Sequence, residues 1–153
     1  MTHSRFPSTR AARTTRAARS ALAAALLAVA SLTATSSFAA DVKVTLHGDQ
    51  EVPAVKTNAI GSGFFAISND RKVSGQINVI NIKAVAAHVH EGAPGASGLI
   101  VFPLLKSGDT SFSVPPNVML TEAQFAAFQA GKLYVNVHTE AHPGGEVRGQ
   151  LKP

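Results

Sequence analysis

The sequence predicts an all-β protein, an antiparallel, Greek-key-like β-sandwich with one short helix. Two observations carry this prediction. Short runs rich in Val, Ile, Phe and Thr recur after residue 40, and Gly, Pro, Asn or Asp stands at their ends, which is the pattern of strands joined by turns. A single stretch, around residue 125, carries instead the signals that begin and end a helix.

Eight strands are predicted from these runs. Along each run the side chains alternate between the two faces of a sheet. Asn69 and Asp70 form a predicted hairpin turn between two of the strands, because both residue types tolerate the backbone angles of a tight turn. The predicted strands cover residues 42–47, 60–67, 72–80, 84–90, 99–103, 110–114, 132–138 and 146–151.

The predicted helix lies between the sixth and seventh of these strands. Thr121 and Gln124 fit a capping box, in which each side chain bonds to the backbone of the other residue. Phe125 and Phe128 are three residues apart, so they share one face of the helix, and we expect both to pack on the core. Gly131 stands where a left-handed residue commonly ends a helix.

Residues 1–39 have the composition of a secretory signal peptide. Arginines without acids precede an apolar run over residues 21–32, and the small residues Ser37 and Ala39 lie three and one positions before a cut near 39/40. The apolar run is shorter than the roughly twenty residues of a spanning helix. We therefore expect residues 41–153 to form one exported domain, periplasmic or extracellular. An uncleaved membrane anchor is the alternative.

Charge and composition exclude several classes of function. From Asp41 onward nine lysines and arginines stand against nine acids, so the net charge of +5 comes from the N-terminal arginines. No basic face for nucleic acid is expected, and no membrane contact after signal cleavage. The chain has no cysteine, which excludes disulfides, thiolate catalysis and iron–sulfur ligation. No catalytic triad order or nucleotide-binding fingerprint is present.

Three histidines form the candidate metal site. His88 and His90 flank one residue of a predicted strand, so their side chains share a face, roughly 6–7 Å apart along the strand. His138 ends another predicted strand, where it shares a face with Tyr134 and Asn136. If the two strands are neighbours, three imidazoles converge on one metal ion. This ligand set suits copper, with zinc as the alternative, and copper(II) binds more tightly at matched geometry.

Other residues near these strands have more than one interpretation. His142 lies in the turn four residues after His138, where it is either a fourth ligand or an exposed turn residue. His47 ends the first predicted strand, and we expect it at the surface. Arg148 is expected as a surface cation, as an ion-pair partner of Glu146, or as a positive charge that draws small anions toward the metal.

Four blocks of sequence point to a known family. They are residues 46–53 (LHGDQEVP), 87–92 (AHVHEG), 130–139 (AGKLYVNVHT) and 143–151 (PGGEVRGQL). Together they resemble the CHRD family, the domain named after its repeats in chordin and common in exported bacterial proteins. The resemblance implies a β-sandwich domain over residues 41–153. In chordin the repeats belong to an extracellular protein that binds growth factors.

A more distant likeness rests on three of the same segments. Residues 88–91 are similar to the copper-binding strand of copper/zinc superoxide dismutases, 137–138 to their later copper-ligand strand, and 145–148 to the segment with their active-site arginine. The likeness implies His88, His90 and His138 as copper ligands and Arg148 as an anion guide. The chain lacks a bridging histidine, a loop with the additional zinc ligands, and cysteines for the internal disulfide. The likeness therefore implies copper binding more than dismutase activity.

Two functional hypotheses follow. The first is an exported protein that binds copper through a three-histidine site, for copper handling, storage or weak redox chemistry. Superoxide dismutase-like activity is its one enzymatic candidate, and we expect such activity to be low or absent. The second is a metal-free extracellular protein-interaction module whose histidines are merely polar. The sequence names no protein partner for either hypothesis.

Overall fold

The computed structural model describes Met1 and residues 38–153. Residues 2–37, most of the predicted signal peptide, lie outside the described residues, and Phe38 and Ala39 begin the first strand. The strands are β1 (Phe38–His47), β2 (Ile60–Ser68), β3 (Val73–Ile80), β4 (Ala86–Glu91), β5 (Ile100–Pro103), β6 (Leu105–Lys106), β7 (Ser111–Ser113), β8 (Leu133–His138) and β9 (Val147–Leu151). A 3-10 helix, η1 (Gly48–Gln50), and an α-helix, α1 (Glu122–Gln129), complete the described elements.

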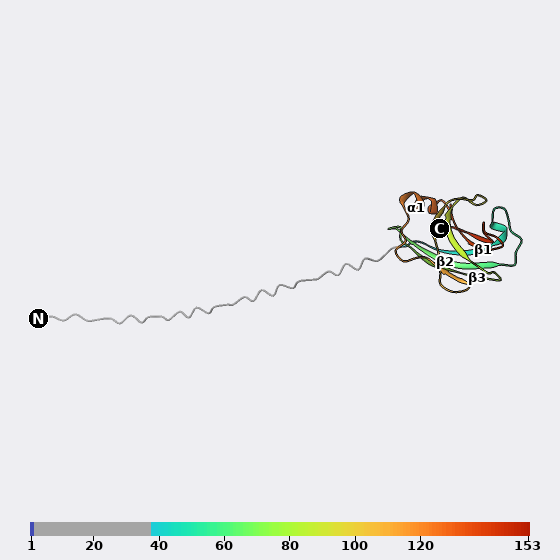
Figure 1. Cartoon of the computed structure of the whole chain (residues 1–153). Coiled ribbons are helices and arrows are strands. Elements are labelled where there is room, and N and C mark those ends of the chain that lie inside the picture. Colours follow the sequence, from blue (N-terminus) through green and yellow to red (C-terminus); the bar gives the residue numbers. More distant parts are fainter. Residues whose placement is uncertain (2–37) are drawn as a thin grey trace. The chain divides into compact units, whose positions relative to one another are not determined.

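The nine strands form one antiparallel sheet that nearly closes on itself (Figure 1). Their order is β5-β4-β8-β9-β1-β2-β3-β7-β6. The two edge strands, β5 and β6, are separated along the chain by Leu104 alone. Residues 100–106 thus pair with β4 through their first half and with β7 through their second half. The predicted all-β, antiparallel class is confirmed, and the two facing halves of the sheet give it a sandwich-like form.

The hydrophobic core lies on the inner face of this sheet. From β4 and β8 it receives Ala87, Val89, Val135 and Val137, each at most 1% exposed. Because successive side chains of a strand point to opposite faces, the residues between these four point outward. The outer face of β4 and β8 is where the histidines lie.

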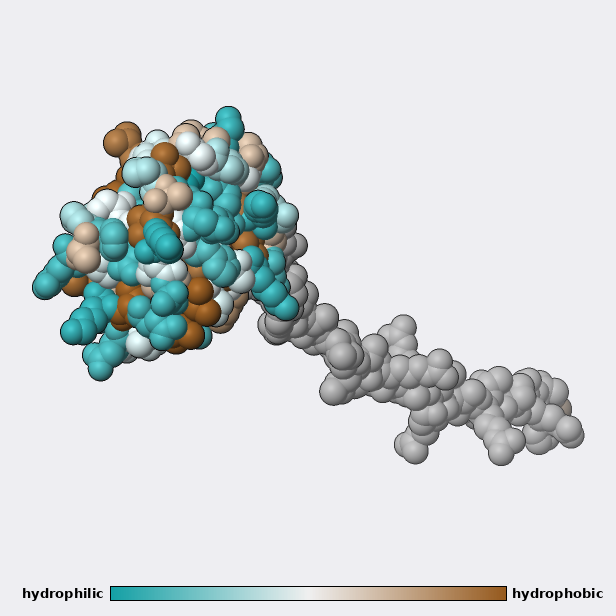
Figure 2. Space-filling model, turned by 90° about the vertical axis from the view of Figure 1, so that its right-hand side faces the viewer, coloured by the Kyte–Doolittle hydropathy of each residue, from teal (hydrophilic) through white to brown (hydrophobic). Residues whose placement is uncertain are grey.

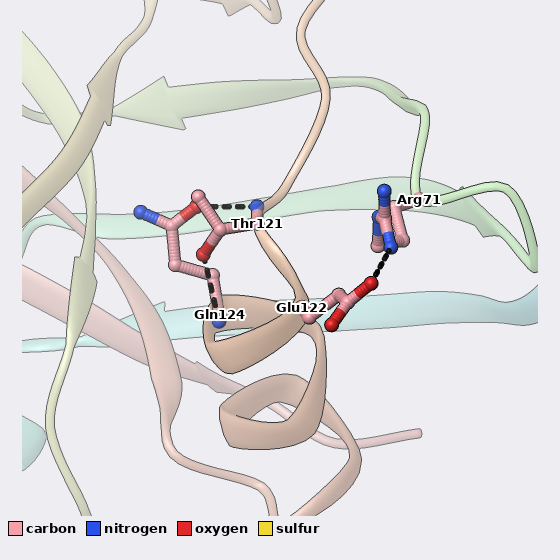
Figure 3. Close-up of polar contacts among 4 residues, drawn as sticks. All are labelled: Arg71, Thr121, Glu122 and Gln124. Carbon is pink, nitrogen blue, oxygen red and sulfur yellow. Dashed lines mark hydrogen bonds and ion pairs between the residues drawn. The ribbon is translucent and has the colours of Figure 1, made fainter.

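The helix α1 begins and ends as predicted. Thr121 Oγ1 accepts a hydrogen bond from the Gln124 backbone N–H at 3.2 Å, and the Gln124 side chain accepts one from the Thr121 N–H at 2.9 Å (Figure 3). Phe128 is 1% exposed, and Phe125 packs against the core while partly buried. Gly131 follows the helix with a φ of +66°. The predicted packing of both phenylalanines on the core is confirmed.

The turn between β2 and β3 is at the predicted place, but its backbone differs from the expectation. Asn69 and Asp70 form the turn, whereas the left-handed residue is Arg71, with a φ of 68°. Ser68 Oγ accepts from the Lys72 backbone N–H at 3.1 Å and is also bonded to Asp70, which stabilises this longer turn. The side chain of Arg71 also forms an ion pair with Glu122 at 3.2 Å (Figure 3).

Within the described part of the chain, no helix is long and apolar enough to cross a membrane. On the face shown in Figure 2, hydrophobic residues occur in separate groups among hydrophilic ones. Scattered groups of this kind are normal for the surface of a folded domain.

Candidate metal centre

The strands β4 and β8 place the three histidines on one face of the sheet. The two strands are antiparallel neighbours, as the prediction required. The residues that share the outer face are Ala86, His88 and His90 on β4, which lie opposite His138, Asn136 and Tyr134 on β8. His138 is therefore opposite an alanine, whose small side chain leaves space for the imidazole.

The three imidazoles converge. Each offers one ring nitrogen, and these nitrogens all lie within 4.8 Å of one another. The ring centroids of His88 and His90 are 5.7 Å apart, and those of His88 and His138 are 4.7 Å apart. A metal ion bonded to histidine nitrogens at about 2.0–2.1 Å needs those nitrogens roughly 3–4 Å apart. The spacing of the three nitrogens is therefore close to that of the ligands of one metal ion.

Backbone carbonyls orient two of the rings. His90 Nδ1 lies 3.0 Å from the Gly98 carbonyl oxygen, and His138 Nδ1 lies 3.0 Å from the Pro143 carbonyl oxygen. A carbonyl only accepts, so each Nδ1 carries a proton, and in the neutral ring Nε2 then keeps a lone pair. His90 Nε2 is buried and has no hydrogen-bond partner among the described residues. His138 Nε2 lies 2.9 Å from His88 Nδ1.

The environment favours the neutral forms of His88 and His138. Burial lowers the pKa of His88 from its ordinary value of 6.5, and the neighbouring His138 and His90 lower it further. Burial also lowers the pKa of His138, and His90 adds to this effect, while the hydrogen bond to Pro143 opposes it. A neutral imidazole has the lone pair that a metal ion requires. Both histidines are therefore ready to act as ligands at neutral pH.

The turn over residues 139–146 carries the carbonyl that orients His138. Thr139 Oγ1 accepts from the His142 backbone N–H at 3.0 Å and donates to Glu146 Oε2 at 2.8 Å. Thr57 donates to the other carboxylate oxygen of Glu146 at 2.7 Å. Glu146 therefore stabilises this turn. The ion pair between Glu146 and Arg148, one of the three interpretations of Arg148, is not formed.

Two histidines considered from the sequence lie outside the cluster. The ring of His142 is not part of the group of ligand atoms found among the described residues, although its backbone shapes the turn after β8. His47 ends β1, where it pairs with Arg148 of β9, and it is also outside the group. The structure thus brings together His88, His90 and His138 and leaves the other two apart.

Arg148 is not at the surface. It is 2% exposed, so its interpretation as a surface cation was wrong. Its guanidinium carbon lies 3.5 Å from the centre of the Tyr134 ring, within the range of a cation–π interaction. Burial lowers the pKa of Arg148 from its ordinary value, while Tyr134 and Glu51 oppose the decrease.

Glu51 is a buried acid that the sequence did not single out. It is 8% exposed, and burial raises its pKa from 4.5 to about 7, although Arg148 and the Asn136 side chain oppose the rise. Its Oε1 has no hydrogen-bond partner among the described residues. In sequence Glu51 follows Asp49 and Gln50 after a strand, a setting typical of an exposed turn, so composition alone carried no signal of its burial.

Comparison with known proteins identifies one family. The family model of the CHRD domain matches residues 42–151, which is nearly all of the part that the structure describes. No curated protein and no solved structure matches the chain.

Proposed function

This chain belongs to the CHRD domain family, and we propose that it is an exported protein that binds one copper ion through His88, His90 and His138 and handles or stores the metal. The observation that carries the proposal is the convergence of three imidazole nitrogens within 4.8 Å. The bonds to the Gly98 and Pro143 carbonyls support it, because they leave Nε2 of His90 and of His138 unprotonated.

The hydrogen bonds favour one set of ligand atoms. His90 and His138 would bind through Nε2, and His88 through Nδ1, which already lies 2.9 Å from His138 Nε2. In the metal-free protein a proton on His88 Nδ1 occupies this contact, since His138 Nε2 is the acceptor. A metal ion bound at Nδ1 takes the place of that proton, which moves to Nε2 of the same neutral ring, so copper uptake should change the tautomer of His88 without net release of a proton.

Copper is the preferred metal and zinc the alternative. Imidazole nitrogens suit both ions, and copper(II) binds more tightly than zinc at matched geometry. The group found among the described residues contains no carboxylate, whereas calcium and magnesium require oxygen ligands. Bound copper would supply a centre that changes between two oxidation states, while the histidines supply neutral ligands.

A calorimetric titration of the purified protein with copper and then with zinc tests the proposal. We expect about one copper ion per chain, with severely weakened binding in His88→Ala and His138→Ala, because each variant leaves an incomplete ligand set. His142→Ala and His47→Ala are the matched controls, since both remove a histidine outside the cluster and should bind like the wild type. Equal affinity in all five proteins would show that the cluster is not the site.

The alternative is a metal-free interaction module. Three apolar side chains near β5 and β6 are well exposed, Leu99 at 85%, Ile100 at 54% and Leu105 at 50%, which favours contact with another protein in this region. Metal analysis of freshly purified protein separates the two functions. Copper near one equivalent supports the copper proposal, and a metal-free protein that also fails to take up copper supports the module.

Export is part of the proposal and rests on the composition of residues 1–39. Mass spectrometry of the protein recovered from the exported fraction should find Ala40 as the first residue. Recovery of the chain with its original N-terminus in the membrane fraction would instead support the uncleaved anchor.

A further inference from the structure

Arg148 is the largest of the fully buried side chains in the described part of the chain. A guanidinium has five N–H donors and remains charged, so its burial requires several acceptors. No carboxylate lies within salt-bridge distance of it among the described residues. Its acceptors are instead backbone and amide oxygens, and most of them belong to the loop that follows β4.

Arg148 holds this loop, residues 92–98, at two points. Nη1 donates to the Ala96 carbonyl at 3.0 Å, and Nη2 donates to the Ala93 carbonyl at 3.0 Å. Nη2 also donates to Gln150 Oε1 at 3.1 Å, and Gln150 Nε2 in turn donates to the Gly92 carbonyl at 2.8 Å. Two neighbouring side chains of β9 therefore hold the loop by its backbone, whatever its own side chains are.

The end of the same loop orients a candidate metal ligand. The Gly98 carbonyl accepts the hydrogen bond from His90 Nδ1 at 3.0 Å, and the Gly98 N–H donates to Tyr134 Oη at 3.1 Å. A Cβ on Gly98 would lie 1.6 Å from the Glu91 carbonyl oxygen, so the loop passes very close to β4 here. The position of the loop thus decides whether a carbonyl reaches the imidazole of His90.

A second connection runs through Tyr134. Its ring is stacked with the His90 ring, with centroids 5.0 Å apart and an angle of 11° between the planes. The guanidinium of Arg148 lies over the same tyrosine at 3.5 Å. Because β8 lies between β4 and β9 in the sheet, the tyrosine lies between the imidazole and the guanidinium. The plane of the His90 ring is therefore set by the stack, and its tautomer by the loop.

From these contacts we infer that Arg148 is a positioning residue for the metal site, which holds His90 in the Nδ1–H tautomer with Nε2 free for the ion. This inference rests on the proposed function for its purpose, but the orientation of His90 exists without a metal. It gives the buried arginine a role through the loop and the tyrosine, in place of a role in drawing anions from solution.

Imidazole nitrogen NMR of the metal-free, purified protein tests the inference, because it reports which nitrogen of each histidine carries the proton. In the wild type we expect the proton of His90 on Nδ1. Arg148→Met keeps a long apolar side chain beside Tyr134 and removes the donors to the loop. In this variant we expect a mixture of both tautomers at His90 and copper binding weakened about 10- to 100-fold, the usual effect of losing a partner that orients a ligand.

His138 is the internal control. Its Nδ1–H bonds to Pro143 in the other turn, so its tautomer should not change in Arg148→Met. Tyr134→Phe is a second, milder variant that keeps the stacked ring and removes only the acceptor for the Gly98 N–H, and it should change His90 in the same direction to a smaller extent.

Two results would overturn the inference. One is an unchanged His90 tautomer in both variants, and the other is an equal change at His90 and His138, which would show a general loss of structure. Copper titration separates this test from the proposed function. A wild type that binds no copper but shows the expected tautomers refutes the copper proposal and retains the role of Arg148 in orienting His90.

Discussion

Acidification tests the candidate metal site through its protons. The pKa values of His88 and His138 are lowered from 6.5 by burial and by neighbouring histidines, so both rings remain mostly neutral at a pH where a free imidazole is half protonated. Copper affinity should therefore change little between pH 7.5 and 6.5. It should decrease at lower pH, as the pH falls through the lowered pKa values of His88 and His138 and protons compete with the metal for the ring nitrogens.

The size of the decrease follows from the number of ligands. Each histidine that must lose a proton weakens binding up to tenfold per pH unit below its pKa, so His88 and His138 together give about 100-fold per unit, or about 2.8 kcal/mol. Copper at one hundred times its Kd stabilises the native state by about 2.7 kcal/mol. A decrease in pH to one to two units below the two pKa values should therefore remove the stabilisation by copper.

Thermal melts with and without copper, in a series of buffers from pH 7.5 to 4.5, measure this effect, and a titration at each pH gives the affinity. His138→Ala provides the comparison, because it has one competing proton fewer and should show a shallower dependence. The reasoning would be refuted by a loss of copper stabilisation that is already complete at pH 7, or by a pH dependence that is as steep in His138→Ala as in the wild type.

Three further predictions concern single residues. Folding raises the pKa of Glu51 from 4.5 to about 7, so its contribution to stability is lost as the pH rises through this range. The free energy of unfolding of Glu51→Gln, relative to that of the wild type, should therefore increase by about 1–3 kcal/mol from pH 5 to pH 8, as measured by urea unfolding. An equal difference between the two proteins at both pH values would contradict this. Phe128 is 1% exposed, so Phe128→Ala should lower the free energy of unfolding by about 3–5 kcal/mol. A loss under 1 kcal/mol would show that the helix does not pack as described. Gly98→Ala should displace the loop from the Glu91 carbonyl and weaken copper binding. Gly144→Ala is the control, because nothing lies within 4 Å of its added Cβ, and it should bind copper like the wild type. Equal copper affinities of the two variants would contradict the role given to the loop.

The cluster itself was predictable because it depends on local rules. The alternation of side chains along a strand places His88 and His90 on one face, and the same rule places His138 beside Tyr134 and Asn136. One assumption was needed, that the two strands are neighbours, and the pairing of β4 with β8 confirms it. The helix was predictable for a similar reason, since the capping box from Thr121 involves residues only three apart.

The surroundings of the cluster were not predictable, because they depend on contacts between distant residues. Arg148 bonds to carbonyls 52 and 55 residues earlier in the chain, and its sequence neighbours carry no sign of those partners. The same is true of Glu51, which is buried by segments remote in sequence. The strand β6 was missed for another reason, since its two residues are too few to show a period.

The near closure of the sheet has a consequence for a protein that has no cysteine. Exposed strand edges act as templates on which other chains add strands, and a sheet without free edges resists such aggregation. Here the edges meet in residues 100–106, so detachment of this one segment would free both edges together. One newly exposed edge would be β4, the strand of His88 and His90. Protection from aggregation and retention of the metal would then fail at the same place, and the segment over residues 100–106 is where a stabilising substitution would serve both.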